Sequence, residues 1–159
     1  MIVPINPKEI PLNIDSPKFC CKPYPNHPKG CPNYGKKNGC PPNVSSLNKI
    51  LDFNKEVFFI YTDFDIGSHA KKMKKMHPDW SERQIYCCLY WQPKARKMQR
   101  QEEARCKKEK SIDLILTSPE AMNVNVTSLM KKVGVNLEWP PRNITRVVSL
   151  GGYQNGNYN

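Results

Sequence analysis

Proline limits what the N-terminal part of this chain can fold into. Ten of the fifteen prolines precede residue 43. Proline fixes φ and lacks an amide hydrogen, so residues 4–42 are predicted to form neither a regular helix nor a central strand. So long a stretch without secondary structure is unusual in a compact domain, and something other than a backbone ladder must order it. Four cysteines inside the stretch supply a candidate.

The cysteines favour a metal centre over disulfides. Seven is an odd number, and in a reducing compartment such a set is typical of metal or redox chemistry. Cys31 and Cys40 each precede proline, which is familiar beside iron–sulfur ligands, and nearby glycines allow sharp turns. Structural zinc sites usually contain short Cys-x2–4-Cys knuckles, which residues 20–42 (the cysteine segment) lack. The sequence therefore predicts an iron–sulfur cluster, most simply 4Fe–4S, with zinc as the alternative.

Cys31 and Cys40 are the firmest candidate ligands. Cys20 or Cys21 is expected to join them, and only one of the two need be a ligand, because neighbouring side chains in extended chain point in opposite directions. The remaining ligand is left open among several groups: Cys20, His27, Cys87, Cys88, Cys106 or a group outside the protein. The full candidate metal set is Cys20, Cys21, Cys31, Cys40, Cys88 and Cys106. The last two are separated by about 27 Å along a straight helix, so both reach one centre only if Pro93 folds the chain back.

Beyond residue 45 the pattern changes to alternating helices and strands. Strands are predicted over residues 56–62, 113–117 and 146–150. Helices are predicted over residues 45–53, 68–77, 79–92 and 94–110, and from residue 118 to near Gly134. Asp79 with Glu82 is interpreted as a helix start, and Pro93 is expected to kink or end that helix. Ser118 followed by proline is a second helix start.

These elements predict a small α/β domain. The expected architecture is a small sheet with flanking helices and an irregular Pro/Cys-rich N-terminal metal-binding segment. Residues 1–150 form one domain, in which 1–45 are the metal-binding segment and 46–150 the α/β core. The core includes a basic helical region at 67–110, and residues 151–159 are expected to be a flexible tail.

The positive charge of this chain favours an anionic partner. The formal net charge is +11, and residues 67–110 hold thirteen Lys/Arg against five Asp/Glu. Interleaved aromatics, from Trp80 to Trp91, suit phosphate neutralisation combined with base stacking. A solvated helix with ordinary core aromatics is the alternative. The candidate nucleic-acid contacts are Lys71, Lys72, Lys74, Lys75, Lys94, Arg96, Lys97 and Arg100. RNA is favoured over DNA, and an acidic protein is the other partner class.

Nothing in the sequence predicts a membrane segment or a secretory signal. No apolar stretch approaches the ~20 residues of a membrane span. The start, residues 1–7, lacks a basic region followed by an apolar run, so a cytoplasmic location is expected. A Gly-rich phosphate loop, a nucleophile elbow and a paired-histidine helix are also missing, which argues against a conventional hydrolase or nucleotide-binding enzyme.

The stretch Cys31-Pro-Asn-Tyr-Gly-Lys-Lys-Asn-Gly-Cys40-Pro-Pro carries a family resemblance. It resembles the C-P-x-Y-G-x-x-W-x-C-P-P signature of an uncharacterised prokaryotic family of predicted metal-binding proteins, domain of unknown function 2284. Residues 118–122 and 134–141 look like that family's C-terminal half. The resemblance implies a cysteine-bound metal centre with Cys31 and Cys40 as ligands. This chain has Pro28 where the family usually has another cysteine, and Asn38 where it has tryptophan.

Three functions remain open on the sequence. The first is an iron–sulfur protein that contacts RNA or a ribonucleoprotein, with sulfur-transfer or desulfuration chemistry at an open iron. The second is a non-catalytic, zinc-stapled module that binds nucleic acid or protein. The third is a small electron-transfer protein, which needs no basic groove. Whether the chain is an enzyme, and its oligomeric state, are left open.

Overall fold

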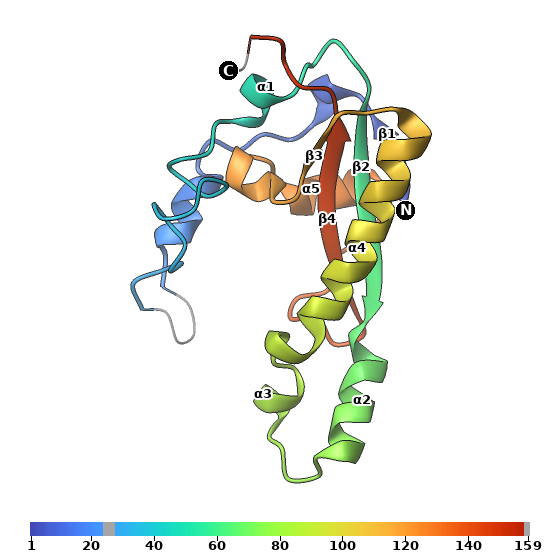
Figure 1. Cartoon of the computed structure of the whole chain (residues 1–159). Coiled ribbons are helices and arrows are strands. Elements are labelled where there is room, and N and C mark those ends of the chain that lie inside the picture. Colours follow the sequence, from blue (N-terminus) through green and yellow to red (C-terminus); the bar gives the residue numbers. More distant parts are fainter. Residues whose placement is uncertain (24–27, 158–159) are drawn as a thin grey trace.

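A computed structural model describes residues 1–23 and 28–157 and shows a small α/β fold. In the described part of the chain, four antiparallel strands form one sheet in the order β1-β2-β4-β3 (Figure 1). The strands are β1 (Ile2–Ile5), β2 (Val57–Asp65), β3 (Leu114–Leu116) and β4 (Ile144–Gly152). The α-helices are α1 (Leu47–Ile50), α2 (Ile66–Met76), α3 (Glu82–Ile85), α4 (Cys88–Lys110) and α5 (Val126–Lys132). Three short 3₁₀ helices are η1 (Pro7–Glu9), η2 (Ser16–Cys21) and η3 (Pro119–Met122).

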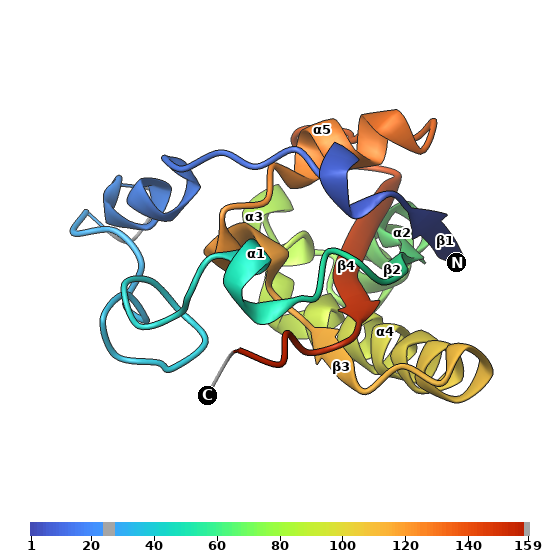
Figure 2. The ribbon, with the colours of Figure 1, turned by 90° about the horizontal axis from the view of Figure 1, so that it is seen from above.

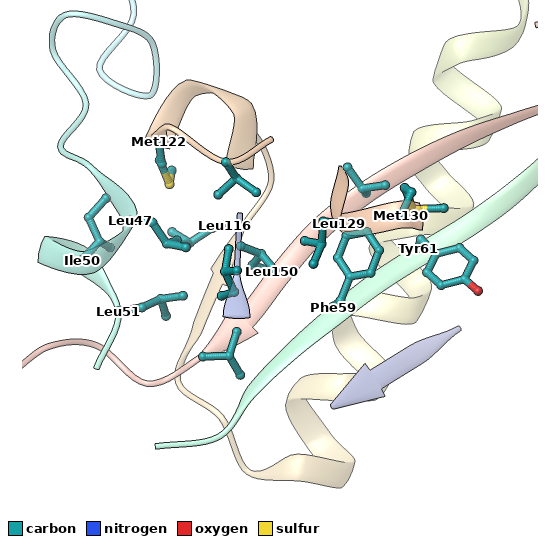
Figure 3. Packing of buried hydrophobic residues seen from close by; sticks show 14 residues of the cluster. Leu47, Ile50, Leu51, Phe59, Tyr61, Leu116, Met122, Leu129, Met130 and Leu150 are labelled. Carbon is teal, nitrogen blue, oxygen red and sulfur yellow. The ribbon is translucent and has the colours of Figure 1, made fainter. Parts of the chain in front are cut away.

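The two long central strands divide the core into two layers. Side chains alternate across a strand, so Phe59 and Tyr61 of β2 face one side and Phe58 and Ile60 face the other. On the first side they pack with residues from α1, η3 and α5, and Leu150 of β4 joins them (Figure 3). Helix α4 covers the second side, as Figure 1 shows. The two central strands are therefore covered on both faces over much of their length.

A buried polar network fixes α4 to the sheet. Gln99, only 2% exposed, donates through Nε2 to the Ile60 carbonyl at 3.0 Å and to Ser149 Oγ at 2.7 Å. Its Oε1 accepts a hydrogen bond from Thr62 Oγ1 at 2.9 Å. Every polar atom of the Gln99 side chain thus has a partner, which makes this burial tolerable and sets the rotation of α4 about its axis.

The proline-rich segment forms 3₁₀ helices, turns and one edge strand, as predicted. Pro4 lies in β1, at the edge of the sheet, where its missing amide costs no ladder bond inside the sheet. Farther along, the amide of Asn13 donates to the Asn123 carbonyl, and the amide of Asn125 donates to the Pro11 carbonyl. These bonds tie residues 11–13 to the loop after η3. Figure 2 shows the cysteine segment extending from there to one side of the core.

Two predicted helix boundaries in the middle of the chain are wrong. The helix predicted to begin at Asp79 begins two residues later. Its N-cap is Ser81, whose side chain forms a capping box with Gln84. The predicted break at Pro93 lies earlier, between α3 and α4, and α4 continues through Pro93 without ending. Pro93 is the sixth residue of α4, beyond the first turn, so its missing amide removes one helical hydrogen bond without ending the helix.

The C-terminal half also departs from prediction at its boundaries. The helix predicted from Ser118 is interrupted at Asn123, which has a left-handed φ of 72° and separates η3 from α5. Gly134, with φ of 79°, follows α5 as expected. Strand β4 runs to Gly152, so the first two residues of the expected tail are buried in the sheet. No described helix has the length and apolarity needed to cross a membrane.

Candidate functional site

A tight turn brings the first two cysteine positions against the third. Cys20 and Cys21 end η2, and the amide of Cys31 donates to the Cys20 carbonyl at 2.7 Å. The turn depends on Gly30, whose φ is 81° and whose Cβ, if it had one, would lie 2.4 Å from the Cys20 oxygen. Only glycine fits such a close approach with a left-handed backbone. The sequence around Gly30 therefore encodes the meeting of η2 with Cys31.

Three thiols line one cavity, which we call the thiol pocket. Its volume is about 460 Å³, and Cys20, Cys21 and Cys31 line it together with Tyr34. The pKa of Tyr34 is raised, chiefly by a hydrogen bond with the Cys21 thiol. Tyr34 was not among the candidate residues predicted from sequence, although its place between Cys31 and Cys40 was visible there. Lys29 and Lys36 also line the pocket, which therefore combines soft sulfur donors with a phenol and two amines.

Electrostatics link Cys40 to the same group. Burial is the first cause that raises the pKa of Cys20, followed by the charges of Cys31, Cys40 and Cys21. The charge of Glu120 in η3 adds a smaller contribution. The pKa of Glu120 itself is raised because neighbouring protein atoms displace water from its carboxyl group, although the residue as a whole is exposed. Burial and neighbouring charges therefore disfavour the ionised form of Cys20, whereas a bound cation would favour it.

This donor set fits a thiophilic metal by its chemistry. Cysteine thiolates select iron–sulfur clusters and zinc over hard cations such as magnesium. Among residues 1–23 and 28–157, no three His, Cys, Asp or Glu side chains converge closely enough to hold a metal ion. The predicted ligand His27 lies outside the described residues. Cys20, Cys21 and Cys31 thus gather at one turn without closing around one point, and Cys40 lines a different pocket, against α4.

The other two predicted ligands lie elsewhere. Cys88 is the exposed first residue of α4. Cys106, near the opposite end of α4, is fully buried and packs with Phe58, Ile60 and Ile112. That burial raises the pKa of Cys106. Because α4 passes through Pro93 as one helix, the structure does not bring Cys88 and Cys106 together (Figure 1).

The predicted nucleic-acid contacts divide among three pockets around α2 and α4. Lys71 and Lys74 line a pocket with Arg142, and Lys72 and Lys94 line one with His69. Arg96 and Arg100 line a third, where α4 meets the cysteine segment. Lys75 and Lys97 are exposed and line none of these three. The lysines and arginines thus form several separate basic sites.

The interleaved aromatics have structural partners. Trp80 stacks on His77, with ring centroids 3.9 Å apart, and contacts Tyr90. Trp91 stacks on Phe64 at 5.8 Å, and its indole N–H donates to the Tyr86 carbonyl at 3.2 Å. These contacts join α2, α3 and α4. Tyr90 remains 49% exposed, so among these rings it offers the clearest free face for a ligand.

His69 introduces a polar group that has no partner. Its Nε2 is buried and makes no hydrogen bond with any described residue. Burial, followed by the charges of Lys94 and Lys72, lowers the pKa of this imidazole. The surrounding cavity measures about 660 Å³ and is lined by methionines of α2 and α4. His69 is therefore held in its neutral form at neutral pH.

Comparisons of this chain with protein-family models, with curated proteins and with solved structures find no match. The resemblance to domain of unknown function 2284 therefore stays a prediction.

Proposed function

We propose that this chain binds an iron–sulfur cluster through the cysteine segment and contacts RNA or a ribonucleoprotein through its basic helices. One observation carries the proposal: Cys20, Cys21 and Cys31 line a single pocket, and Cys40 lies within electrostatic range of Cys20. Cys20, Cys31 and Cys40 are the proposed ligands, with Cys21 as the alternative to Cys20. A cluster held by three cysteines would leave one iron open, which would allow sulfur-transfer or desulfuration chemistry on a nucleotide.

The metal proposal is tested by anaerobic purification and reconstitution with iron and sulfide. We expect a brown protein with broad visible absorbance and about four irons per chain for a 4Fe–4S cluster. Cys31→Ser and Cys40→Ser should lose the absorbance. Cys88→Ser is the matched control, because Cys88 is exposed and lies outside the cysteine segment. A chain that retains no iron, or a control that loses as much as the ligand variants, contradicts the proposal.

The RNA proposal is tested by fluorescence anisotropy with a labelled single-stranded RNA at increasing salt. Phosphate contacts release counterions, so affinity should fall steeply as salt rises. The double variant Lys72→Gln/Lys94→Gln removes two cations of one pocket, and the salt slope should fall by about two. The control Lys8→Gln/Lys49→Gln removes the same charge away from the three basic pockets. Equal losses in both variants would show that only net charge matters.

A zinc-stapled binding module is the second candidate, and the weak burial of the cysteine segment favours it. Helix η2, which ends at Cys21, contains no buried residue, and Cys31 and Cys40 are only partly buried. Residues 11–13 are bonded to the loop after η3, so a metal held farther along would complete a staple at the far end. One zinc per chain, no visible absorbance, and loss of order in residues 14–42 on chelation would select this candidate.

A further inference from the structure

A pocket of about 480 Å³ lies where the cysteine segment meets α4, and we call it the junction pocket. One wall comes from α4, whose residues at positions i, i+3, i+4 and i+7 share a face: Arg96, Gln99, Arg100 and Glu103. The opposite wall includes Lys37 and Cys40 of the cysteine segment. Met122 of η3 and Val147 of β4 also line the pocket. The volume is within the range of sites that hold small organic ligands.

Glu103 is an unpartnered carboxylate in this pocket. The residue is 9% exposed, and in the described part of the chain it makes no hydrogen bond and no ion pair. Its neighbour Gln99, one turn earlier, has every polar side-chain atom satisfied. Its carboxylate oxygens keep contact with solvent, because among the described residues the fully buried side-chain atom without a hydrogen-bond partner is His69 Nε2. A ligand that brings N–H donors into the pocket would therefore find an unpaired acceptor in Glu103, so this residue is suited to recognition.

The pocket's cations are also free. Arg96, Arg100 and Lys37 make no ion pair with any described residue. Three cations face one carboxylate, so the pocket favours a ligand with net negative charge that also presents a donor edge. A zwitterion satisfies only part of this charge balance. Met122 and Val147 add apolar surface against which a flat ring can pack.

We propose that the junction pocket binds a guanine nucleotide, with the base on Glu103 and the phosphate on the cations. The Watson–Crick edge of guanine carries two adjacent donors, N1–H and the 2-amino group, which a carboxylate accepts together. Charge-assisted, bidentate hydrogen bonds of this kind are both strong and selective. Arg96, Arg100 and Lys37 supply the phosphate contacts through side chains, so no Gly-rich loop is needed.

This inference deepens the proposed RNA contact, and it rests on that proposal only for the source of the nucleotide. A guanosine of single-stranded RNA and free GMP present the same base and phosphate chemistry. Cys40 lines the same pocket, so the bound nucleotide would share the pocket with a proposed metal ligand. That position connects the substrate site with the sulfur chemistry proposed for the cysteine segment.

The test is isothermal titration of the full chain with GMP, IMP and AMP, and anisotropy with guanosine-containing and guanosine-free RNA. We expect GMP to bind best, IMP, which lacks the 2-amino donor, to bind less well, and AMP least. Glu103→Gln should weaken GMP binding about tenfold or more and remove the preference over AMP. Glu109→Gln is the matched control, because Glu109 lies on the exposed face of α4. Arg100→Gln should weaken GMP and AMP alike, and Lys108→Gln should weaken neither.

Each outcome bears on one proposal or the other. Equal affinity for GMP and AMP, or unchanged GMP binding in Glu103→Gln, overturns the inference, even if RNA still binds through the basic helices. GMP binding with the expected selectivity and no RNA binding supports the inference and overturns the RNA proposal. Thermal unfolding of each variant shows whether it is folded. Because Glu103 has no protein partner, Glu103→Gln should unfold at the wild-type temperature or above it.

Discussion

The cysteine segment and the α/β core are ordered by different means. In the core, seven of the nine residues of β2 are buried, and pairing with β1 and β4 satisfies its backbone. Among the described residues of the cysteine segment, only Gly30 and Pro41 are buried. Hydrophobic burial therefore explains the core and leaves the cysteine segment with turns and a few backbone bonds. We therefore expect the order of the cysteine segment to depend on the metal centre proposed for it, whereas the core should keep its fold without a metal.

The largest expected effect is in the core. Phe59→Ala removes a fully buried ring and should lower the free energy of unfolding by about 3–5 kcal/mol. Phe19→Ala is the matched change next to the cysteine segment. Phe19 is 53% exposed, so this change should lower the free energy of unfolding by less than about 0.5 kcal/mol. Urea denaturation followed by tryptophan fluorescence measures both. A similar loss of stability in Phe19→Ala would show that burial does not distinguish the two regions.

The polar network under α4 should give the next effect. Gln99→Ala leaves Thr62 and Ser149 without their buried partner, at a cost of about 1–3 kcal/mol for each unsatisfied group. Gln101→Ala, on the exposed face of the same helix, is the control and should change stability little. Thermal and chemical denaturation provide the measurement. If both variants are equally stable, the network does not set the position of α4.

Gly30→Ala should act on the cysteine segment alone. A left-handed backbone costs a non-glycine residue about 1–2 kcal/mol, and the new Cβ would meet the Cys20 carbonyl. We expect loss of metal uptake and faster amide exchange at Cys31, with the core's unfolding midpoint unchanged. Gly39→Ala is the control, because a Cβ there meets nothing within 4 Å. A global loss of stability in Gly30→Ala would show that the two regions unfold together.

The smallest effect is the pH dependence of the core. The pKa of His69 is lowered from its ordinary value of 6.5, so the unfolded chain binds a proton more readily than the folded one. Stability linked to His69 is present above pH 6.5 and is lost as the pH falls below that value. His69→Phe should flatten the decrease of stability between pH 7 and pH 5. An unchanged pH profile would indicate that His69 titrates alike in both states.

Local patterns predicted much of the fold. The apolar, β-branched run at 57–62 identified β2, and Gly134 identified the end of α5. The break at Asn123 and the passage of α4 through Pro93 depend on packing that no local pattern shows. The clustering of Cys20, Cys21 and Cys31 was predictable from proline and glycine placement. The positions of Cys88 and Cys106 were not, because they depend on the course of α4.

The candidate recognition site was harder to predict. Arg96, Gln99, Arg100 and Glu103 share one helical face, which the sequence spacing alone could have shown. Their pairing with Lys37, far away in sequence, depends on how the cysteine segment docks beside α4. The sequence singled out Arg96 and Arg100 as basic residues. It did not single out Glu103, the carboxylate on the same helical face. The positive charge of the sequence indicated a basic surface. The absence of a protein partner for Glu103, which only the structure shows, indicated where on that surface a ligand would bind.

The unequal strand lengths of the sheet have a consequence for self-association. The outer strands β1 and β3 have four and three residues, whereas the central β2 and β4 have nine each. Short outer strands offer few free backbone groups to an incoming strand, and Pro4 in β1 contributes no amide hydrogen. The sheet is thus protected at its margins against growth by strand addition and against amyloid-like stacking. Replacing Pro4 with valine would restore a donor at that margin and raise the tendency to aggregate.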